Sequence, residues 1–536
     1  MLFNSIEFLV FLPIVFAIYW LLRNQLKLQN LFVVLASYVF YGWWDWRFLL
    51  LIAFTSLCSW YSGILIGKPK TRNPESSEDD PISLEQQTAS EISVLPRGAQ
   101  TIISRQSSAQ SCVNALPDSL QKNTPKCQKI NAAKAWMITN IVLNLGILVT
   151  FKYYDFFMSE FGAMFGISTE SLLLRIILPV GISFYTFQAL SYSIDVYRGN
   201  IKPTKDIVAF LAFISFFPQL VAGPIERATN LLPQFLQKRT FSYEQGVDGM
   251  RQILWGLFKK IVVADNCAMY VDQVWATYDT QSGSTLLLAA ILFTFQIYGD
   301  FSGYSDIAIG TAKLFGIKLM RNFNNPYFSR DIAEFWRRWH ISLTTWFRDY
   351  VYIPLGGSRV GKWKIVRNTF VVFFLSGFWH GANWTFIAWG AYHSVLFLPL
   401  ILLGMNRKYT NQVAEGRWLP NVKEIGQILL TFMLAVIGWI IFRAQTITDA
   451  WHYICGMMQE ETLRASYLFF VQHGIRTTCW LCLVMLIIEW MQRNRQHGLD
   501  IAHVHPIWRV VIFVVLVEVI LFFLPATPSS FIYFQF

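Results

Sequence analysis

The amino-acid sequence predicts an all-α integral membrane protein, a bundle of helices that cross the bilayer. Of the 536 residues, 54% are hydrophobic and only 14% are charged, whereas about a quarter of the residues in a typical soluble domain are charged. Apolar runs of about 20 residues, the length that crosses a bilayer, recur along the chain. Because lipid offers backbone amides no hydrogen-bond partner, such runs must be helical or be shielded by other helices.

The runs expected to cross the membrane extend over almost the whole chain. They include 2–22, 48–67, 135–151, 425–442 and 510–524. With the other apolar stretches they predict about ten to twelve spanning helices. Trp and Tyr gather near their ends, as at 41–46, where amphipathic rings favour the headgroup level. The first run has neither a basic segment before it nor a small-residue cleavage site after it, so we expect it to remain as the first helix.

Basic residues in short loops predict the orientation, because loops rich in Lys and Arg stay in the cytoplasm. Arg23 and Lys27 follow the first run, and Lys68, Lys70 and Arg72 follow the third. We therefore expect an extracytoplasmic N-terminus and a cytoplasmic segment after the third run. Such loops account for the net charge of +11 without a nucleic-acid-binding module, so no nucleic-acid partner is expected.

The composition divides the chain into three segments. Residues 1–67 are expected to form the N-terminal transmembrane helices, and 134–536 the membrane core. Between them, 68–133 is rich in Ser, Gln, Pro and charged residues and poor in aromatic residues. Because such a segment cannot bury enough apolar surface to fold, it predicts a disordered cytoplasmic insertion that acts as a linker.

Cysteine spacing gives no reason to expect a metal site. The close pair Cys479 and Cys482 lies within an apolar run. Since no histidine accompanies this CxxC pair, we expect it to pack between helices rather than to bind zinc or to act in redox chemistry.

A first polar cluster interrupts the apolar pattern at 296–306. It contains Asp300, Ser302, Ser305 and Asp306, separated by glycines that permit close helix approach. Charged groups at membrane depth cost from about 2.5 to above 10 kcal/mol, so they face a cavity or pair with one another. A structural network is the interpretation that we favour here over a catalytic one.

A second cluster places charges beside an imidazole. If 334–342 forms one helix, Glu334 and Arg338 are partners four residues apart and Arg337 lies one turn before His340. This segment is too charged to cross lipid unshielded and too aromatic for a solvated loop. We expect a re-entrant or tilted helix that lines a funnel and places its arginines, with Arg348 further along, near an anionic substrate.

A third cluster embeds His380 between two strongly apolar runs, within 376–384. A histidine at membrane depth could be a satisfied packing residue. We favour a chemical role, because imidazole is the side chain best suited to exchange protons near neutral pH. Asn383, in the same cluster, is a candidate for substrate binding.

These strings resemble the membrane-bound O-acyltransferase (MBOAT) family, and within it the branch of alginate O-acetyltransferase subunits. The resemblance rests on Glu-Phe-Trp-Arg-Arg-Trp-His at 334–340 and Trp-His-Gly at 379–381, together with 217–226 and the Phe-Ile-Tyr-Phe-Gln-Phe string at 531–536. It covers nearly the whole chain except 68–133, which departs from the short loop usual in the family. Segment 134–536 would then be the catalytic membrane core.

The resemblance implies a bundle of about eleven membrane helices, with re-entrant helices around a central tunnel. His380 would be the catalytic histidine and His340 its assistant. The donor would be acetyl-CoA from the cytoplasm, with no bound cofactor. The acceptor would be an extracytoplasmic polysaccharide, reached through a separate periplasmic acetyltransferase protein, and the enzyme would lie in the plasma (inner) membrane.

Other functions remain open from sequence alone. Relatives with similar motifs transfer D-alanine to teichoic acid or acylate lipids, so the resemblance leaves the acyl group and the acceptor open. A transporter would use intramembrane polar residues as an ion path, but the two internal repeats common in transporters are not evident. A scaffold of an envelope polysaccharide complex, with inert histidines, is the third alternative.

Cysteine labelling in intact cells tests the predicted orientation. In a cysteine-free background, a membrane-impermeant maleimide should label Ser5→Cys on the outer side but not Ser107→Cys in the insertion. Labelling after permeabilisation controls for the reactivity of both positions. If position 107 reacts in intact cells, the orientation is the reverse of the predicted one.

Overall fold

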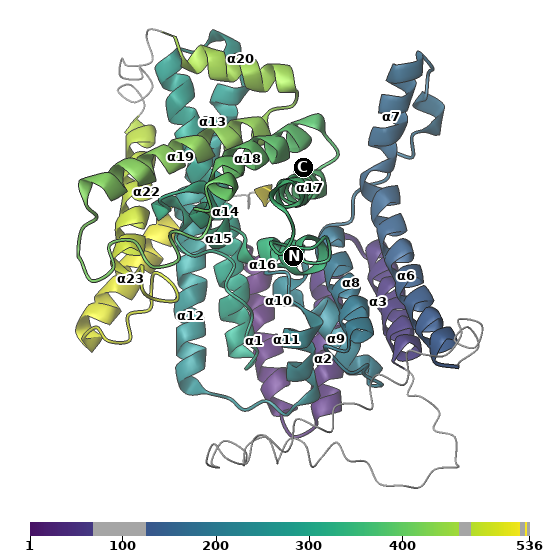
Figure 1. Cartoon of the computed structure of the whole chain (residues 1–536). Coiled ribbons are helices and arrows are strands. Elements are labelled where there is room, and N and C mark those ends of the chain that lie inside the picture. The colour runs from purple at the N-terminus through teal and green to yellow at the C-terminus, as the bar shows by residue number, and fades with distance from the viewer. Residues whose placement is uncertain (68–124, 460–472, 526–530, 533–536) are drawn as a thin grey trace, which may run out of the picture.

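All regular structure in the described part of the chain is helical, as predicted. The computed structural model describes residues 1–67, 125–459, 473–525 and 531–532, and these contain no strand. The helices pack into one bundle, and the labelled N-terminal end lies near its middle (Figure 1).

The N-terminal half consists of helices of very different lengths. They are α1 (Ile6–Leu21), α2 (Leu26–Asp45), α3 (Arg47–Ile66), α6 (Pro125–Lys152), α7 (Tyr154–Phe165), α8 (Ile182–Arg198), α9 (Ile207–Ser215), α10 (Phe217–Leu220) and α11 (Ala228–Leu236). Helix α6 packs against α3 and α8, whereas α7 projects beyond its neighbours (Figure 1).

The C-terminal half contains the longest helix and most of the predicted motifs. Its elements are α12 (Tyr243–Leu257), the π-helix η6 (Phe258–Ala264), α13 (Asp265–Ala276), α14 (Gly283–Leu314), α15 (Ile332–Arg338), α16 (Ile341–Phe347), the π-helix η9 (Arg348–Tyr352), α17 (Lys362–His380), α18 (Trp384–Leu402), α19 (Val422–Arg443), α20 (Ile447–Met457), α22 (His473–Met491) and α23 (Pro506–Phe522). Short 3₁₀ turns occupy Glu170–Leu172, Tyr278–Thr280 and Pro326–Phe328.

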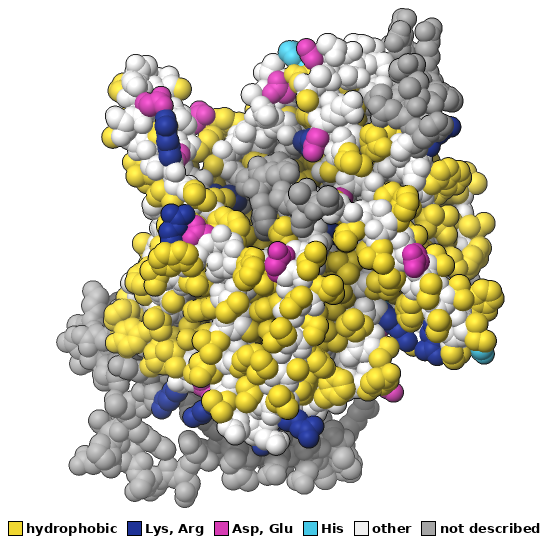
Figure 2. Space-filling view, turned by 180° about the vertical axis from the view of Figure 1, so that it is seen from behind, with side chains coloured by type: hydrophobic (Ala, Val, Ile, Leu, Met, Phe, Trp, Pro, Cys, Tyr) yellow, Lys and Arg dark blue, Asp and Glu magenta, His cyan; other side chains and the backbone are white. Residues whose placement is uncertain are grey.

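The protein is an integral membrane protein with several spans. Among the described residues, six helices are long and apolar enough to cross a bilayer. They are Arg47–Ile66, Ala132–Lys152, Gly283–Leu314, Trp384–Leu402, Val422–Arg443 and Gly474–Met491. Each of the five apolar runs named above coincides with a helix. On the face shown in Figure 2, a broad hydrophobic belt crosses the bundle, and several Lys and Arg side chains lie along its lower edge.

The predicted insertion coincides only partly with described residues. Residues 68–124 lie outside the described part of the chain. The end of the predicted insertion is helical, because α6 begins at Pro125. The predicted boundary at 133/134 followed the change in composition, which comes several residues after the start of the helix.

Glycines allow α12 and α14 to approach closely, as the sequence predicted for the 296–306 cluster. A Cβ atom at Gly303 would lie 2.7 Å from the carbonyl oxygen of Gly256, and a Cβ atom at Gly256 would lie 2.5 Å from that of Gly303. Ion pairs accompany this contact: Lys259 Nζ lies 2.6 Å from Asp306 Oδ2. Lys260 Nζ lies 2.8 Å from Asp300 Oδ1.

The glycine contact predicts a position-specific loss of stability. Gly303→Ala should destabilise the fold by about 1–3 kcal/mol, because overpacking forces two backbones apart. Gly146→Ala is the matched control, since no other part of the described structure comes within 4 Å of its added Cβ, apart from its chain neighbours and the backbone of its own helix. Thermal unfolding in detergent measures both variants. Equal unfolding midpoints for Gly303→Ala and Gly146→Ala would contradict the prediction, because they would show that the close contact of α12 and α14 does not contribute to stability.

Candidate active site

His340 lies at a break between two helices, in a left-handed backbone conformation. Helix α15 ends at Arg338, and His340, with φ 43° and ψ 54°, precedes α16. Left-handed backbone costs roughly 1–2 kcal/mol for a residue other than glycine, and such strain gathers at functional sites. The prediction that one helix presents both the arginines and this imidazole is therefore wrong.

The segment 322–324 holds this break in place by hydrogen bonds. The amide of Ile341 donates to the carbonyl oxygen of Asn322 at 2.9 Å, and the amide of Asn324 donates to that of Arg338 at 2.9 Å. The chain leaves its helix because a neighbouring segment supplies these partners. The 3.6-residue pattern of 334–342 does not indicate that hydrogen bonds to another segment replace those within the helix.

The side chain of Asn322 fixes the tautomer of His340. Asn322 Oδ1 accepts hydrogen bonds from the amide of Ser342 at 3.3 Å and from its hydroxyl at 2.9 Å. Because a backbone N–H only donates, this atom is the carbonyl oxygen of the amide. His340 Nδ1 lies 3.0 Å from the same oxygen, so Nδ1 carries the proton and Nε2 keeps its lone pair. Within the described residues, Nε2 has no hydrogen-bond partner, which leaves it available to a substrate.

His380 is the last residue of α17 and is surrounded by aromatic rings. Its ring centroid lies 4.9 Å from that of Trp379, 5.2 Å from Trp389 and 5.1 Å from Phe442. The ring of His340 lies 6.0 Å from that of Trp379. One indole therefore contacts both histidines, and the two motifs meet in space although they are far apart in the sequence.

A cavity of about 280 Å³ lies beside His380. Lys152, Trp379 and His380 line one part of it, and residues 177–184 line another. Its walls combine an imidazole and an ammonium group with apolar side chains. A cavity of this size is large enough to hold a small acyl group.

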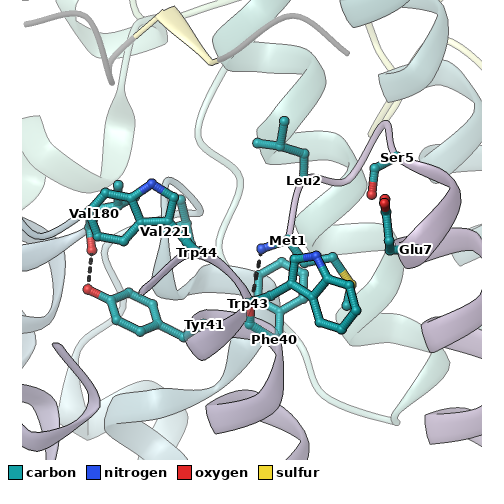
Figure 3. A pocket seen from close by; sticks show the side chains of 10 residues that line it. All are labelled: Met1, Leu2, Ser5, Glu7, Phe40, Tyr41, Trp43, Trp44, Val180 and Val221. Carbon is teal, nitrogen blue, oxygen red and sulfur yellow. Dashed lines mark hydrogen bonds between the residues drawn. The ribbon is translucent and has the colours of Figure 1, made fainter. Parts of the chain in front are cut away.

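A second cavity, of about 290 Å³, adjoins the first one, because both are lined by Trp44, Val180 and Val221 (Figure 3). Its wall includes Glu7 and the amino group of Met1, which donates to the carbonyl oxygen of Phe40 at 3.0 Å. Burial lowers the pKa of this amino group to about 6. Together the two cavities reach from the N-terminal residues to His380.

Three of the four polar residues predicted in the 296–306 cluster line a small cavity, and Asn322, the partner of His340, lines it too. This cavity, of about 20 Å³, includes Ser302, Ser305 and Asp306 in its wall, together with Asn322. Asn322 Nδ2 donates to Ser305 Oγ at 3.2 Å. Asp300 lies elsewhere: its Oδ2 accepts from the amide of Ile532 at 2.6 Å.

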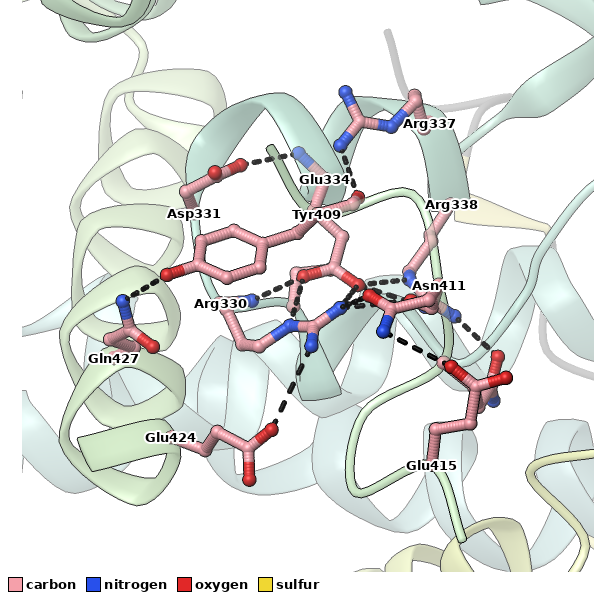
Figure 4. A network of polar contacts seen from close by, with 12 residues as sticks. Arg330, Asp331, Glu334, Arg337, Arg338, Tyr409, Asn411, Glu415, Glu424 and Gln427 are labelled. Carbon is pink, nitrogen blue, oxygen red and sulfur yellow. Dashed lines mark hydrogen bonds and ion pairs between the residues drawn. The ribbon is translucent and has the colours of Figure 1, made fainter. Parts of the chain in front are cut away.

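Glu334 is buried between two arginines (Figure 4). Arg338 Nη2 lies 2.9 Å from Glu334 Oε1, which confirms the predicted pairing at four-residue spacing, and Arg330 Nε lies 3.0 Å from Glu334 Oε2. Arg337 donates to the carbonyl oxygens of Asn406 at 2.7 Å and Tyr409 at 2.6 Å. These contacts stabilise the loop that follows α18.

The other two predicted substrate-binding residues lie apart from this network. Arg348 pairs with Asp349 at 2.6 Å, and its side chain is 56% exposed. Asn383 begins α18, where its Oδ1 accepts from the amide of Thr385 at 3.0 Å while its Nδ2 donates to the carbonyl oxygen of Gln445 at 2.9 Å. The structure thus brings the two histidines together at Trp379, beside the cavity that His380 lines, whereas Arg337, Arg338 and Arg348 contact other partners.

Comparisons with known proteins identify similar sequences. The family model described as "MBOAT, membrane-bound O-acyltransferase family" matches residues 142–407, a range that contains both histidines. The chain is 37% identical to the probable alginate O-acetylase of Pseudomonas aeruginosa over 472 residues, covering 87% of this chain and 77% of the relative. It is 33% identical to the peptidoglycan O-acetyltransferase of Helicobacter pylori, covering 75% of this chain and 82% of that relative. It is 30% identical to the teichoic acid D-alanyltransferase of Bacillus subtilis, covering 49% of this chain and 68% of that relative.

The hydrogen bond between Asn322 and His340 predicts a loss of acyl transfer when the amide is removed. Asn322→Leu should lower the rate by up to about 10²-fold, the cost of misplacing a group at the site, because the tautomer of His340 is no longer fixed. Transfer from labelled acetyl-CoA in proteoliposomes measures the effect. Asn144→Leu is the matched control, as it removes a buried amide of α6 that bonds to Ser59 and Asn140. Equal rates in the two variants would exclude a special role for Asn322.

Proposed function

Because the chain belongs to the membrane-bound O-acyltransferase family, we propose that it moves an acetyl group from cytoplasmic acetyl-CoA across the plasma (inner) membrane for O-acetylation of an extracytoplasmic polysaccharide of the alginate type. That it is an O-acyltransferase follows from the family and from its O-acetyltransferase relatives. The observation that carries the proposal is the meeting of His340 and His380 at Trp379 beside a cavity.

In the proposed reaction, His380 acts as the base. It removes the proton of the acceptor hydroxyl while the hydroxyl oxygen attacks the thioester carbonyl carbon. The C–S bond then breaks, and the leaving thiolate takes the proton to give CoA–SH. A positioned base contributes roughly 10²–10⁴-fold. His340 assists, because its unpaired Nε2 can orient a reacting group near the same indole.

We propose that the donor reaches the histidines from the cytoplasm and the acceptor from outside, through a tunnel among about eleven membrane helices, some of them re-entrant. The adjoining cavities at Met1 and His380 support the outer half of this path. The basic side chains along one edge of the hydrophobic belt support the proposed orientation, with residues 68–133 in the cytoplasm (Figure 2).

The anionic donor is proposed to bind near Arg337, Arg338 and Arg348, with Asn383 as a further contact. The exposed guanidinium of Arg348 supports this assignment. Since the other two arginines also hold Glu334 or backbone carbonyls, their replacement would perturb the fold. Arg348→Gln is therefore the variant that isolates donor affinity.

The acceptor is proposed to be reached through a separate periplasmic acetyltransferase protein. Peptidoglycan is the second candidate acceptor, because the Helicobacter pylori relative is a peptidoglycan O-acetyltransferase and is similar over most of its length. D-alanyl transfer is a third possibility, from the shorter match to teichoic acid D-alanyltransferases. A transporter or an inert scaffold would give no acetyl-CoA turnover by purified protein.

Histidine variants test the proposed roles. His380→Ala and His380→Gln should abolish acetyl transfer, since an amide cannot take up a proton at neutral pH. His340→Ala should keep a residual rate. His393→Ala serves as the matched control: His393 is buried like the other two histidines, but it accepts a hydrogen bond from Trp336 Nε1 at 3.4 Å and lies against Gly438.

The measurement is transfer from labelled acetyl-CoA in proteoliposomes, with thermal unfolding of each variant as the check on folding. We expect the His393→Ala variant to keep the largest share of the wild-type rate. A wild-type rate in His380→Gln would overturn the proton-transfer role of this residue.

A further inference from the structure

The helix that carries His380 ends in the interior of the bundle. The last four carbonyl groups of any helix lack partners within it, and α17 ends at His380 with the next residue, Gly381, in extended backbone. An unpaired carbonyl group in an apolar interior costs roughly 1–3 kcal/mol. Partners must therefore come from another part of the chain.

Two consecutive residues at the end of α6 supply these partners. Lys152 Nζ donates to the carbonyl oxygens of Trp379 at 2.7 Å and His380 at 2.8 Å. Tyr153 Oη donates to the carbonyl oxygen of Phe378 at 2.8 Å. The last three carbonyl groups of α17 are thus bound by one neighbouring helix end.

Further contacts make this arrangement rigid. The rings of Tyr153 and Phe378 stack with their centroids 4.2 Å apart and an angle of 13° between their planes. Lys152 Nζ also lies 5.8 Å from the ring of Trp379. Within the described residues, no carboxylate pairs with Lys152, so the partial negative charge at the end of α17 is the counterpart of this cation.

We propose that Lys152 and Tyr153 are positioning residues that hold the end of α17 and thereby set the place of the His380 imidazole in its cavity. The aromatic contacts of that ring with Trp389 and Phe442 restrict it only loosely, because such packing has broad geometric preferences. The hydrogen bonds to the carbonyl groups act on its backbone directly. This inference rests on the proposed catalytic role of His380.

The clamp of Lys152 and Tyr153 also joins the site to α7. Helix α7 begins at Tyr154, directly after the clamp, and projects from the bundle (Figure 1). A displacement of α7 would pull first on the two side chains that hold the end of α17. Residues outside the two histidine motifs therefore control the geometry of His380.

Four variants test the clamp. Lys152→Met removes both hydrogen bonds but keeps an apolar stem, and Lys152→Arg restores a cationic donor. Tyr153→Phe removes one hydrogen bond while retaining the stacked ring. Thr150→Val is the matched control on the same helix, because the Thr150 hydroxyl donates to the carbonyl oxygen of Gly146 within that helix at 2.9 Å.

We expect Lys152→Met to lower kcat about 10- to 100-fold, the cost of a small misplacement of a catalytic group, with KM for acetyl-CoA unchanged. Lys152→Arg should recover part of the loss, Tyr153→Phe should show a smaller loss, and Thr150→Val should match the wild type. The rate at which diethyl pyrocarbonate modifies His380, read by mass spectrometry, should change in Lys152→Met and Tyr153→Phe but not in Thr150→Val.

A wild-type kcat and a wild-type modification rate in Lys152→Met would overturn the clamp. If Lys152→Met fails to fold, Tyr153→Phe decides, and wild-type values for that variant overturn the proposal. Failure of the proposed function gives a different result: the wild-type protein then transfers no acetyl group, while the modification rates still report on the clamp.

Discussion

The fold depends on one constraint: polar groups that lie away from water must find their partners inside the protein. Glu334 forms ion pairs with two arginines, and Lys260 forms ion pairs with Asp300 and Asp265. A carboxylate or an ammonium group left alone at this depth would cost several kcal/mol. Such pairs join helices that lipid alone would not drive together, because lipid chains are as apolar as the helix faces.

The same constraint decides where helices can end. At His340 the chain leaves the helical conformation because residues 322–324 form hydrogen bonds with the backbone on both sides of the break, at Arg338 and Ile341. At His380 the partners come from Lys152 and Tyr153. Both histidines therefore lie at helix ends whose backbone groups are hydrogen-bonded to another segment. These bonds fix the backbone position from which each imidazole side chain extends. Against that background, the unpartnered Nε2 of His340 is a group left for a ligand.

Sequence alone predicts the parts of this structure that are local. The five long apolar runs coincide with helices, and Glu334 pairs with Arg338 at the predicted four-residue spacing. The helix break at His340 was missed, because the residues from 334 onward are compatible with a continuous helix and the competing hydrogen bonds come from elsewhere in the chain. Tertiary contacts overrode local propensity there.

Asn322 and Lys152, which contact His340 and the end of the helix that carries His380, were missed for a related reason. Asn322 stood in a string of polar residues with nothing to mark it, and its role depends on the placement of Ser342 and His340. Lys152 looked like an ordinary lysine at the end of a span, where such side chains usually reach toward the headgroups. Its hydrogen bonds connect positions 227 and 228 residues apart, a distance over which periodicity carries no information.

The shortness of α1 has a consequence for how the chain meets the surrounding lipid. Its 16 residues make a helix about 24 Å long, against a hydrocarbon core of about 30 Å. A helix of this length with its C-terminal end at the headgroups of one leaflet would end short of the headgroups of the other. The residues at its N-terminal end, where Met1 and Glu7 line a cavity, would then lie below that headgroup level.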